Sequence, residues 1–471
     1  MDAANSTQPR PAWHFGGLYI AMLAAAVCIF YVIRRAGSGL TADLPAVLPI
    51  VGGGNSGLVS MVQILVALVT IVSAAQLFGR LFVKLRQPAV VGEIIAGLVL
   101  GPSLFGAWAP STMQWLLPSS VAPVLSALSQ VGVILYMFLI GLELDAKVLN
   151  RHRHASVTIS HASIVAPFLA GATLALLLYP SFGTKAVSFT VFALFCGVAM
   201  SVTAFPVLAR ILRDRGLSST PLGVTAIACA AVDDVTAWCL LAVVVGAINA
   251  DTANAGSTIS LALAYVLVMF TLVGPGLKRA IGLERDGGVS QALLAVILIV
   301  LLCSSLATEL IGIHAIFGAF LVGVMIPPDS KVAAGIRNRI EDLVVVLLLP
   351  IFFAYTGTRV QIGLLQSPFE WLMCALVILT ACAGKFGGTA LAARFTGLGW
   401  RDAAVLGTLM NTRGLVELIV LNLGLDLGVL SPSLFTMFVV MAVVTTAATS
   451  PMLTLIAPSQ PSAGLLSNET Q

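Results

Sequence analysis

The chain has 471 residues, of which 59% are hydrophobic and 9% are charged. Soluble domains carry roughly 25% charged residues because their surfaces meet water, so this composition excludes an ordinary soluble protein. The net charge of +4 comes from short basic clusters between apolar stretches, which excludes the basic face that nucleic-acid binding needs. We predict an all-α polytopic membrane protein whose surface mainly contacts the lipid bilayer.

Apolar stretches of about 20 residues, long enough to cross the hydrocarbon as helices, recur along the chain. They predict about 13–14 transmembrane helices, depending on whether the first stretch is retained. The stretches lie near residues 15–33, 57–79, 88–103, 121–143, 155–179, 186–212, 221–248, 257–277, 288–308, 312–327, 341–361, 369–394, 402–425 and 433–456.

The first stretch, 15–33, could also be read as a cleaved signal peptide. Only Arg10 precedes it as a basic residue, and no small-residue cleavage site follows cleanly. We therefore predict an extra transmembrane helix within an N-terminal segment that covers residues 1–56.

Basic residues concentrate in every second loop, beginning with Arg80, Lys84 and Arg86 after the second stretch. Loops rich in Lys and Arg stay on the cytoplasmic side of a membrane. We expect these loops to be cytoplasmic, together with a short tail over residues 457–471. The location expected for such a multi-pass chain is the cell inner membrane.

Two of the predicted helices are interrupted at their middles. The stretch 186–212 contains Thr203 and Pro206, and the stretch 402–425 contains Asn411 and Thr412. The two stand seven helices apart, and this odd offset gives them opposite directions in the bilayer. Paired interrupted helices in inverted repeats indicate the binding site of a secondary transporter.

Asp233 and Asp234 lie near the middle of the stretch 221–248, between apolar residues. An ionised carboxylate at the bilayer centre is costly unless a proton, a cation or water compensates it. Burial and mutual repulsion both favour the protonated form, so such a group can hold a proton or a hard cation in the same place. We predict that both aspartates bind a monovalent cation and protons, with Thr203 adding a hydroxyl or a freed carbonyl. A purely structural role for the pair is the competing interpretation.

Four further charged residues of the predicted helices are candidates for a role near the site. Lys385 lies mid-helix and is expected to pair with Asp233, so that its removal would leave the aspartate unpaired. Arg413 and Glu417, four residues apart, share a helix face and are expected to hold the interrupted helix together. Glu93 is predicted to line a cytoplasmic funnel.

Four segments, in this order, resemble the motifs of the monovalent cation:proton antiporter-2 family. They are 87–104 (QPAVVGEIIAG followed by GPSL), 138–145 (FLIGLELD), 203–210 (TAFPVLAR) and 411–418 (NTRGLVEL). The resemblance covers roughly residues 58–451. It implies that residues 57–456 form a transmembrane cation/proton exchanger domain, with core and dimerisation subdomains interleaved along the chain.

The resemblance further implies two crossed, broken helices, elevator-type alternating access and a homodimer. The essential carboxylate of the family is similar to Asp234 here. The two adjacent aspartates together with Lys385 resemble the site of electrogenic sodium/proton exchangers. The neighbouring motifs look closer to those of potassium-handling exchangers.

We therefore predict an antiporter that exchanges protons for Na⁺ or K⁺, without a cofactor and without enzymatic activity. Aspartyl protease chemistry is disfavoured because residues i and i+1 of one helix diverge by about 100° and cannot face each other. Export of a larger solute on the same fold and a cation channel are the alternatives.

Overall fold

The computed structural model describes residues 12–42, 44, 61–85, 87–143, 153–185, 187–217, 220–249, 255–282 and 289–456. Helices account for nearly all of this part of the chain, whose β-structure is one isolated bridge between Leu44 and Thr184. The predicted all-α class is confirmed. The N-terminal segment 1–56 is described only from residue 12 and with gaps, and the tail 457–471 lies outside the described residues.

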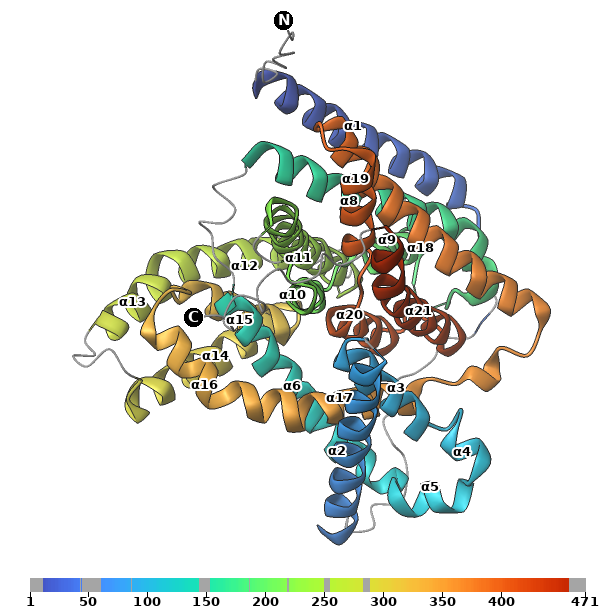
Figure 1. The fold of residues 1–471 in the computed structure, drawn as a ribbon, viewed down its shortest axis with the longest axis vertical. Coiled ribbons are helices and arrows are strands. Elements are labelled where there is room, and N and C mark those ends of the chain that lie inside the picture. The colour runs from blue at the N-terminus through green and yellow to red at the C-terminus, as the bar shows by residue number, and fades with distance from the viewer. Residues whose placement is uncertain are drawn as a thin grey trace, which may run out of the picture.

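Figure 1 shows the arrangement of the helices. Their bounds are α1 Ala12–Gly37, α2 Met61–Lys84, α3 Ala89–Leu100, α4 Phe105–Trp108, α5 Pro110–Leu116, α6 Ala122–Glu143, α8 Arg153–Phe182, α9 Phe189–Ser201, α10 Phe205–Asp214, α11 Pro221–Asn249, α12 Ala255–Val268, α13 Gly274–Gly282, α14 Gln291–Ile311, α15 Ala315–Met325, α16 Lys331–Leu343, α17 Leu349–Arg359, α18 Pro368–Phe395, α19 Trp400–Met410, α20 Leu415–Asp426 and α21 Pro432–Ile456.

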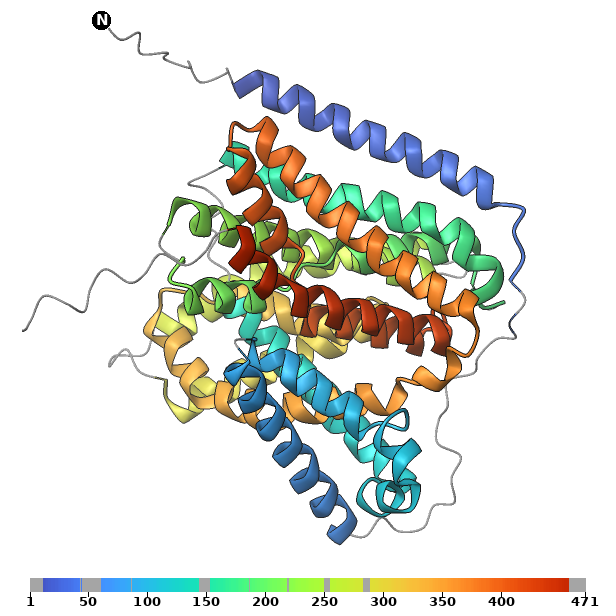
Figure 2. The same ribbon diagram turned by 45° about the vertical axis from the view of Figure 1, so that its right-hand side comes forward.

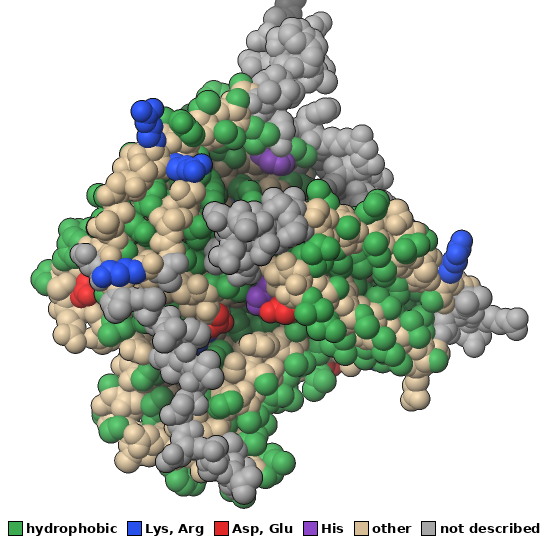
Figure 3. All heavy atoms as spheres, turned by 180° about the vertical axis from the view of Figure 1, so that it is seen from behind, with side chains coloured by type: hydrophobic (Ala, Val, Ile, Leu, Met, Phe, Trp, Pro, Cys, Tyr) green, Lys and Arg blue, Asp and Glu red, His purple; other side chains and the backbone are tan. Residues whose placement is uncertain are grey.

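Eleven helical segments of the described residues are long and apolar enough to cross a membrane, and the bent pair α19–α20 makes a twelfth. The apolar α15, 11 residues long, and the N-terminal α1, 26 residues long, are two further candidates. Together these match the upper end of the predicted range. Figure 2 shows the long helices running side by side in one general direction, with α1 along the outer edge. On the face shown in Figure 3, most of the described side chains are uncharged.

The closest helix packing divides the molecule into two bundles. The core bundle consists of α1, α8–α11 and α18–α21, in which α8 packs against both α9 and α18. The second bundle consists of α2, α3, α6 and α12–α17, in which α6 packs against α15 and α17, and α2 against α3. Each bundle combines segments from both halves of the chain.

Small residues allow close packing inside the second bundle. A side chain at Gly97 of α3 would collide with the carbonyl of Phe353 in α17, and one at Gly357 would collide with the carbonyl of Gly97. Helices in hydrocarbon associate through such close backbone contact because lipid supplies no hydrophobic drive between them.

Both predicted helix interruptions are present, and they cross each other inside the core bundle. Residues 202–204 separate α9 from α10, and residues 411–414 separate α19 from α20, which are bent by 47°. Pro206 stands in the first turn of α10, where its missing N–H costs no helical hydrogen bond. The amide of Ala204 donates to the carbonyl of Thr412 at 3.0 Å, which ties the two interruptions together.

Two other helices contain π-helical turns that the hydropathy pattern does not predict. These turns cover Met269–Val273, before α13, and Val344–Leu348, before α17. Pro275 and Pro350 follow them closely. Because proline has no N–H, a local change of the hydrogen-bond ladder accommodates it without ending the helix.

Candidate ion-binding site

The two adjacent aspartates lie on α11 beside the crossing of the broken helices. Both side chains are completely buried, with 0% of their surface exposed. α11 packs against α8 and α9, and α10 also lies against it. The site therefore combines a continuous helix with the ends of interrupted ones, and the two carboxyl groups differ sharply in their surroundings.

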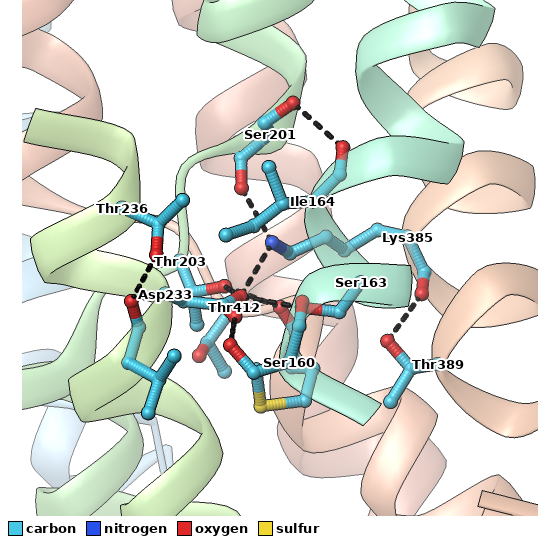
Figure 4. A network of polar contacts seen from close by, with 12 residues as sticks. Ser160, Ser163, Ile164, Ser201, Thr203, Asp233, Thr236, Lys385, Thr389 and Thr412 are labelled. Atoms are coloured by element: carbon cyan, nitrogen blue, oxygen red, sulfur yellow. Dashed lines mark hydrogen bonds and ion pairs between the residues drawn. The ribbon is translucent and has the colours of Figure 1, made fainter. Parts of the chain in front are cut away.

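Asp233 is fully engaged by donors from three different segments, as Figure 4 shows. Ser160 Oγ donates to its Oδ1 at 2.5 Å, and Ser163 Oγ donates to its Oδ2 at 2.6 Å. Thr203 Oγ1, from the interruption between α9 and α10, donates to Oδ2 at 2.8 Å. Lys385 Nζ, from α18, donates to the same oxygen at 3.0 Å. Three of these donors share Oδ2 and one reaches Oδ1, so both oxygens of this carboxylate are hydrogen-bonded.

Asp234 has the opposite surroundings. Both of its oxygens are buried and have no hydrogen-bond partner among the described residues. The main-chain N–H of Phe205, at the start of α10, faces this carboxyl group without reaching hydrogen-bond geometry. A buried carboxyl group without partners is costly when ionised, so it requires a proton or a cation.

Lys385 is also completely buried, which no other lysine of the described residues is. Besides Asp233, its ammonium group donates to the carbonyl of Ser201 at 2.5 Å, at the last residue of α9. The lysine thus connects α18 to α11 and to the end of a broken helix. The structure brings together the two residues that the sequence analysis paired.

Arg413 and Glu417 form the second buried ion pair, with 3.0 Å between Nη1 and Oε2. The guanidinium group also donates to the carbonyls of Ala199 and Met200, at 3.0 and 2.7 Å. These carbonyls belong to the last turn of α9, where helical carbonyls lack partners. Arg413 therefore joins one broken helix to the other, whereas we expected it to support only its own.

The remaining predicted residues of the second interruption have local partners. Asn411 Nδ2 lies 3.5 Å from Cys382 Sγ, and Thr412 Oγ1 donates to the carbonyl of Leu409 at 2.8 Å. Thr446 of α21 donates to the Arg413 carbonyl and accepts from the Arg413 amide. The interruption is thus held by neighbours on α18 and α21.

A cavity of about 400 Å³ opens between the two bundles and reaches the crossing. Ala204 and Pro206, which flank Phe205, line its inner part, and Leu415 and Val416 line it from α20. Its charged lining residues are Glu93, Glu143, Glu341, Arg210, Arg213 and Arg337. Glu93 therefore lies in the cavity wall, away from Asp233 and Asp234.

The described residues contain no group of three or more His, Cys, Asp or Glu side chains that could hold a resident metal ion. The Asp234 carboxylate offers two buried oxygens that have no hydrogen-bond partner in this part of the chain. Oxygen ligands of this kind suit hard cations.

Ser160 and Ser163 are the site residues that the sequence analysis missed. They stand three residues apart on α8 and are both completely buried. Serine is common in membrane helices, so only the spacing i, i+3 on one face could have drawn notice. Nothing in the sequence indicates that this face meets Asp233.

Residues 64–456 match the family described as sodium/hydrogen exchanger, transmembrane. The chain is also 44% identical over 406 residues to the Na⁺/H⁺ antiporter NhaS4 of Synechocystis sp., covering 85% of this chain and 98% of that protein.

The chain belongs to the sodium/hydrogen exchanger family.

Membership in this family confirms the resemblance drawn from the four motifs. Among other relatives, K⁺/H⁺ antiporter 1 of Saccharomyces cerevisiae is 34% identical over 388 residues, which cover 80% of this chain and 44% of the yeast protein. Cation/H⁺ antiporter 20 of Arabidopsis thaliana is 38% identical over 407 residues, which are 84% of this chain and 48% of the plant protein. The chain thus spans a little under half the length of the yeast and plant relatives.

The fold is also that of a solved exchanger. The sodium proton antiporter MjNhaP1 from Methanocaldococcus jannaschii superposes with a TM-score of 0.62, covering 84% of this chain and 97% of that one. The sequences are only 16% identical, so the likeness concerns the fold. The exchanger described here is accordingly a multi-pass membrane protein.

Proposed function

We propose that this protein exchanges protons for Na⁺ or K⁺ across the membrane, with Asp234 as the carrier of both. The observation that carries the proposal is the contrast between the two aspartates. Asp233 has four donors, whereas Asp234 has no hydrogen-bond partner among the described residues. A carboxylate of this kind must be compensated by a proton or by a cation.

Exchange follows from this single place of binding. A proton and a cation cannot occupy the Asp234 carboxylate together, so the release of one permits binding of the other. When Asp234 is ionised and holds neither ion, the site cannot easily change the side to which it opens, because an uncompensated charge in hydrocarbon is costly. Because the site changes sides only when it holds a proton or a cation, movement of one ion is coupled to movement of the other.

Access would alternate between the two sides of the membrane. The cavity of about 400 Å³ reaches the crossing from one end and is lined by residues of both bundles. Arg213 and Arg337 lie in its wall, and basic residues favour the cytoplasmic side. We infer a state open to the cytoplasm, a cytoplasmic C-terminus and an inner-membrane location. Movement of the core bundle against the second bundle, in a homodimer, would open the opposite side.

The names of the relatives do not decide whether the exchanged cation is Na⁺ or K⁺. Their names describe a Na⁺/H⁺ antiporter in Synechocystis, a K⁺/H⁺ antiporter in yeast and a Na⁺/H⁺-K⁺ antiporter in Bacillus cereus. Each name concerns that relative. A cation series with the purified protein therefore has to include both ions.

The test is proton movement in liposomes that contain the purified protein, with Na⁺, K⁺, Li⁺ or Rb⁺ added after a pH gradient is imposed. We expect at least one of these ions to dissipate the gradient. Asp234→Asn should remove this response, because the amide has a similar shape but cannot exchange a proton. Asp402→Asn, the same change at an exposed position of α19, is the control and should respond like the wild type. Wild-type rates from Asp234→Asn would overturn the proposal.

Competition at one carboxylate also predicts a shift of the pH profile. One proton and one cation compete, so the pH of half-maximal exchange should fall by about one unit for each tenfold rise in cation concentration. The measurement is the initial rate of exchange over a grid of pH and cation concentration. A midpoint that does not move would show that the two ions bind at separate places.

A further inference from the structure

Two serine hydroxyl groups of α8 donate hydrogen bonds to Asp233 and not to Asp234. Among the described residues, Ser160 alone donates to Asp233 Oδ1, and Ser163 shares Oδ2 with Thr203 and Lys385. Ser160 and Ser163 face α11 from one turn of α8, as Figure 4 shows. Without Ser160, Oδ1 would be a buried acceptor with no donor.

The position of these hydroxyl groups is set by close packing of α8 against α18. A side chain at Gly384 would collide with the backbone of Pro167, and one at Gly388 would collide with Ala166 and the carbonyl of Ala162. The same contact brings Lys385, between these two glycines, to the carboxylate that the serines hold. The serines and the lysine therefore reach Asp233 from adjoining helices whose spacing is fixed by small residues.

We propose that Ser160 and Ser163 are positioning residues that hold Asp233 out of the cation site and so make the site selective for monovalent ions. The inference rests on the proposed exchange at Asp234. Both oxygens of Asp233 have donors and its charge is paired with Lys385, so Asp234 alone offers uncompensated negative charge to the ion, and one charge balances one monovalent cation. Two ionised carboxylates on adjacent residues, both available to the ion, would instead offer the charge and the oxygen ligands that suit divalent cations such as Ca²⁺ or Mn²⁺.

Removal of the hydroxyl groups should therefore change which cation the site accepts. In Ser160→Ala/Ser163→Ala, Oδ1 of Asp233 loses its donor, while Lys385 and Thr203 still hold Oδ2. Hydrogen bonds to charged groups are strong enough that losing one changes an equilibrium by roughly tenfold. The freed oxygen belongs to the residue next to Asp234 in α11, and it is then available to an ion as a second carboxylate ligand.

The experiment compares inhibition of cation/proton exchange by Ca²⁺ and by Mn²⁺ in liposomes containing the wild type or the double variant. We expect the double variant to be inhibited at concentrations lower by about tenfold or more, and its KM for the monovalent cation to change. Thr173→Ala is the matched control, because it removes a hydroxyl group of α8 that donates to the Leu169 carbonyl of its own helix. It should show the wild-type inhibition and KM.

Ser160→Ala alone, which strips Oδ1 of its donor, gives the same test if the double variant does not fold. Ser160→Thr keeps the hydroxyl group and should restore wild-type selectivity. A wild type that exchanges ions while both alanine variants keep its KM and its resistance to divalent ions would overturn this inference and leave the proposed function intact. A wild type without exchange would instead contradict the proposed function itself.

Discussion

Two buried ion pairs lie within the core bundle, and they are built in different ways. Both have 3.0 Å between their charged atoms and completely buried side chains. Arg413 and Glu417 belong to one stretch of chain, and the arginine also holds the end of α9. Lys385 and Asp233 come from different helices, and the aspartate has three hydroxyl donors besides the lysine.

The difference lies in what remains when one partner is removed. Loss of Arg413 leaves Glu417 without its partner and removes the hydrogen bonds that the guanidinium group donates to two carbonyls at the end of α9. Loss of Lys385 removes its hydrogen bond to the Ser201 carbonyl at the end of α9, but leaves Asp233 with three donors. A buried charge that is stranded costs far more than one that keeps its hydrogen bonds. Removal of the arginine should therefore cost more stability than removal of the lysine.

The largest expected effect is on stability in Arg413→Ala. Breaking a buried ion pair by removing one partner costs about 3–5 kcal/mol, and the α9 carbonyls add to this. Thermal unfolding in detergent, followed by loss of the monodisperse peak in size-exclusion chromatography, measures the change. An Arg413→Ala protein that unfolds at the wild-type temperature would contradict the structural role.

Arg413→Lys should have an intermediate effect. Lysine keeps the charge but cannot donate to Glu417, Ala199 and Met200 at once, because it lacks the planar fork of the guanidinium group. Loss of one or two charge-assisted hydrogen bonds corresponds to about 1.5–3 kcal/mol each. The same unfolding assay applies. A stability equal to that of the wild type would show that charge alone, without geometry, holds the crossing.

Lys385→Ala should destabilise the protein less than either change at Arg413, by about 1–2 kcal/mol, because Asp233 retains Ser160, Ser163 and Thr203. This loss of stability is smaller than the sequence by itself suggests, because the sequence analysis gave Asp233 no partner except Lys385. Adding Ser160→Ala and Ser163→Ala to Lys385→Ala should then lower stability by more than the separate changes combined. Simple additivity would show that the hydroxyl groups do not substitute for the lysine.

Lys385→Gln should have the smallest effect on stability, but it tests the role of the lysine in charge movement. The amide still donates to Asp233 but has no proton to release. Exchange of one proton for one cation at Asp234 should continue, while a second proton released by the lysine in each turnover, and the net charge that it moves, should be lost. Current on a solid-supported membrane, compared with proton flux at zero imposed potential, measures this ratio. A wild type that moves protons without any cation-induced current would show electroneutral exchange, and the lysine would then have no part in charge movement.

Much of the architecture could be predicted because hydrocarbon imposes simple rules on a chain. The transmembrane stretches follow from runs of apolar residues, and the interruptions follow from Pro206 and from the polar segment at Asn411 and Thr412. The π-helical turns before α13 and α17 were missed, because they change the hydrogen-bond ladder without changing hydropathy. Arg413 was identified, but its bonds to α9 depend on a contact between segments about 200 residues apart in sequence.

The sequence by itself determined that this chain crosses the membrane many times, and that two adjacent carboxyl groups lie where water is scarce. It also determined the family, because four motifs stand in order along the chain. Only the tertiary structure decided that Asp233 accepts four hydrogen bonds and that Asp234 accepts none from the described residues. The reason is physical: the spacing of residues along one helix places both aspartates at the same depth, but their hydrogen-bond donors come from α8, α18 and the crossing. Which donors reach which oxygen depends on how those helices pack.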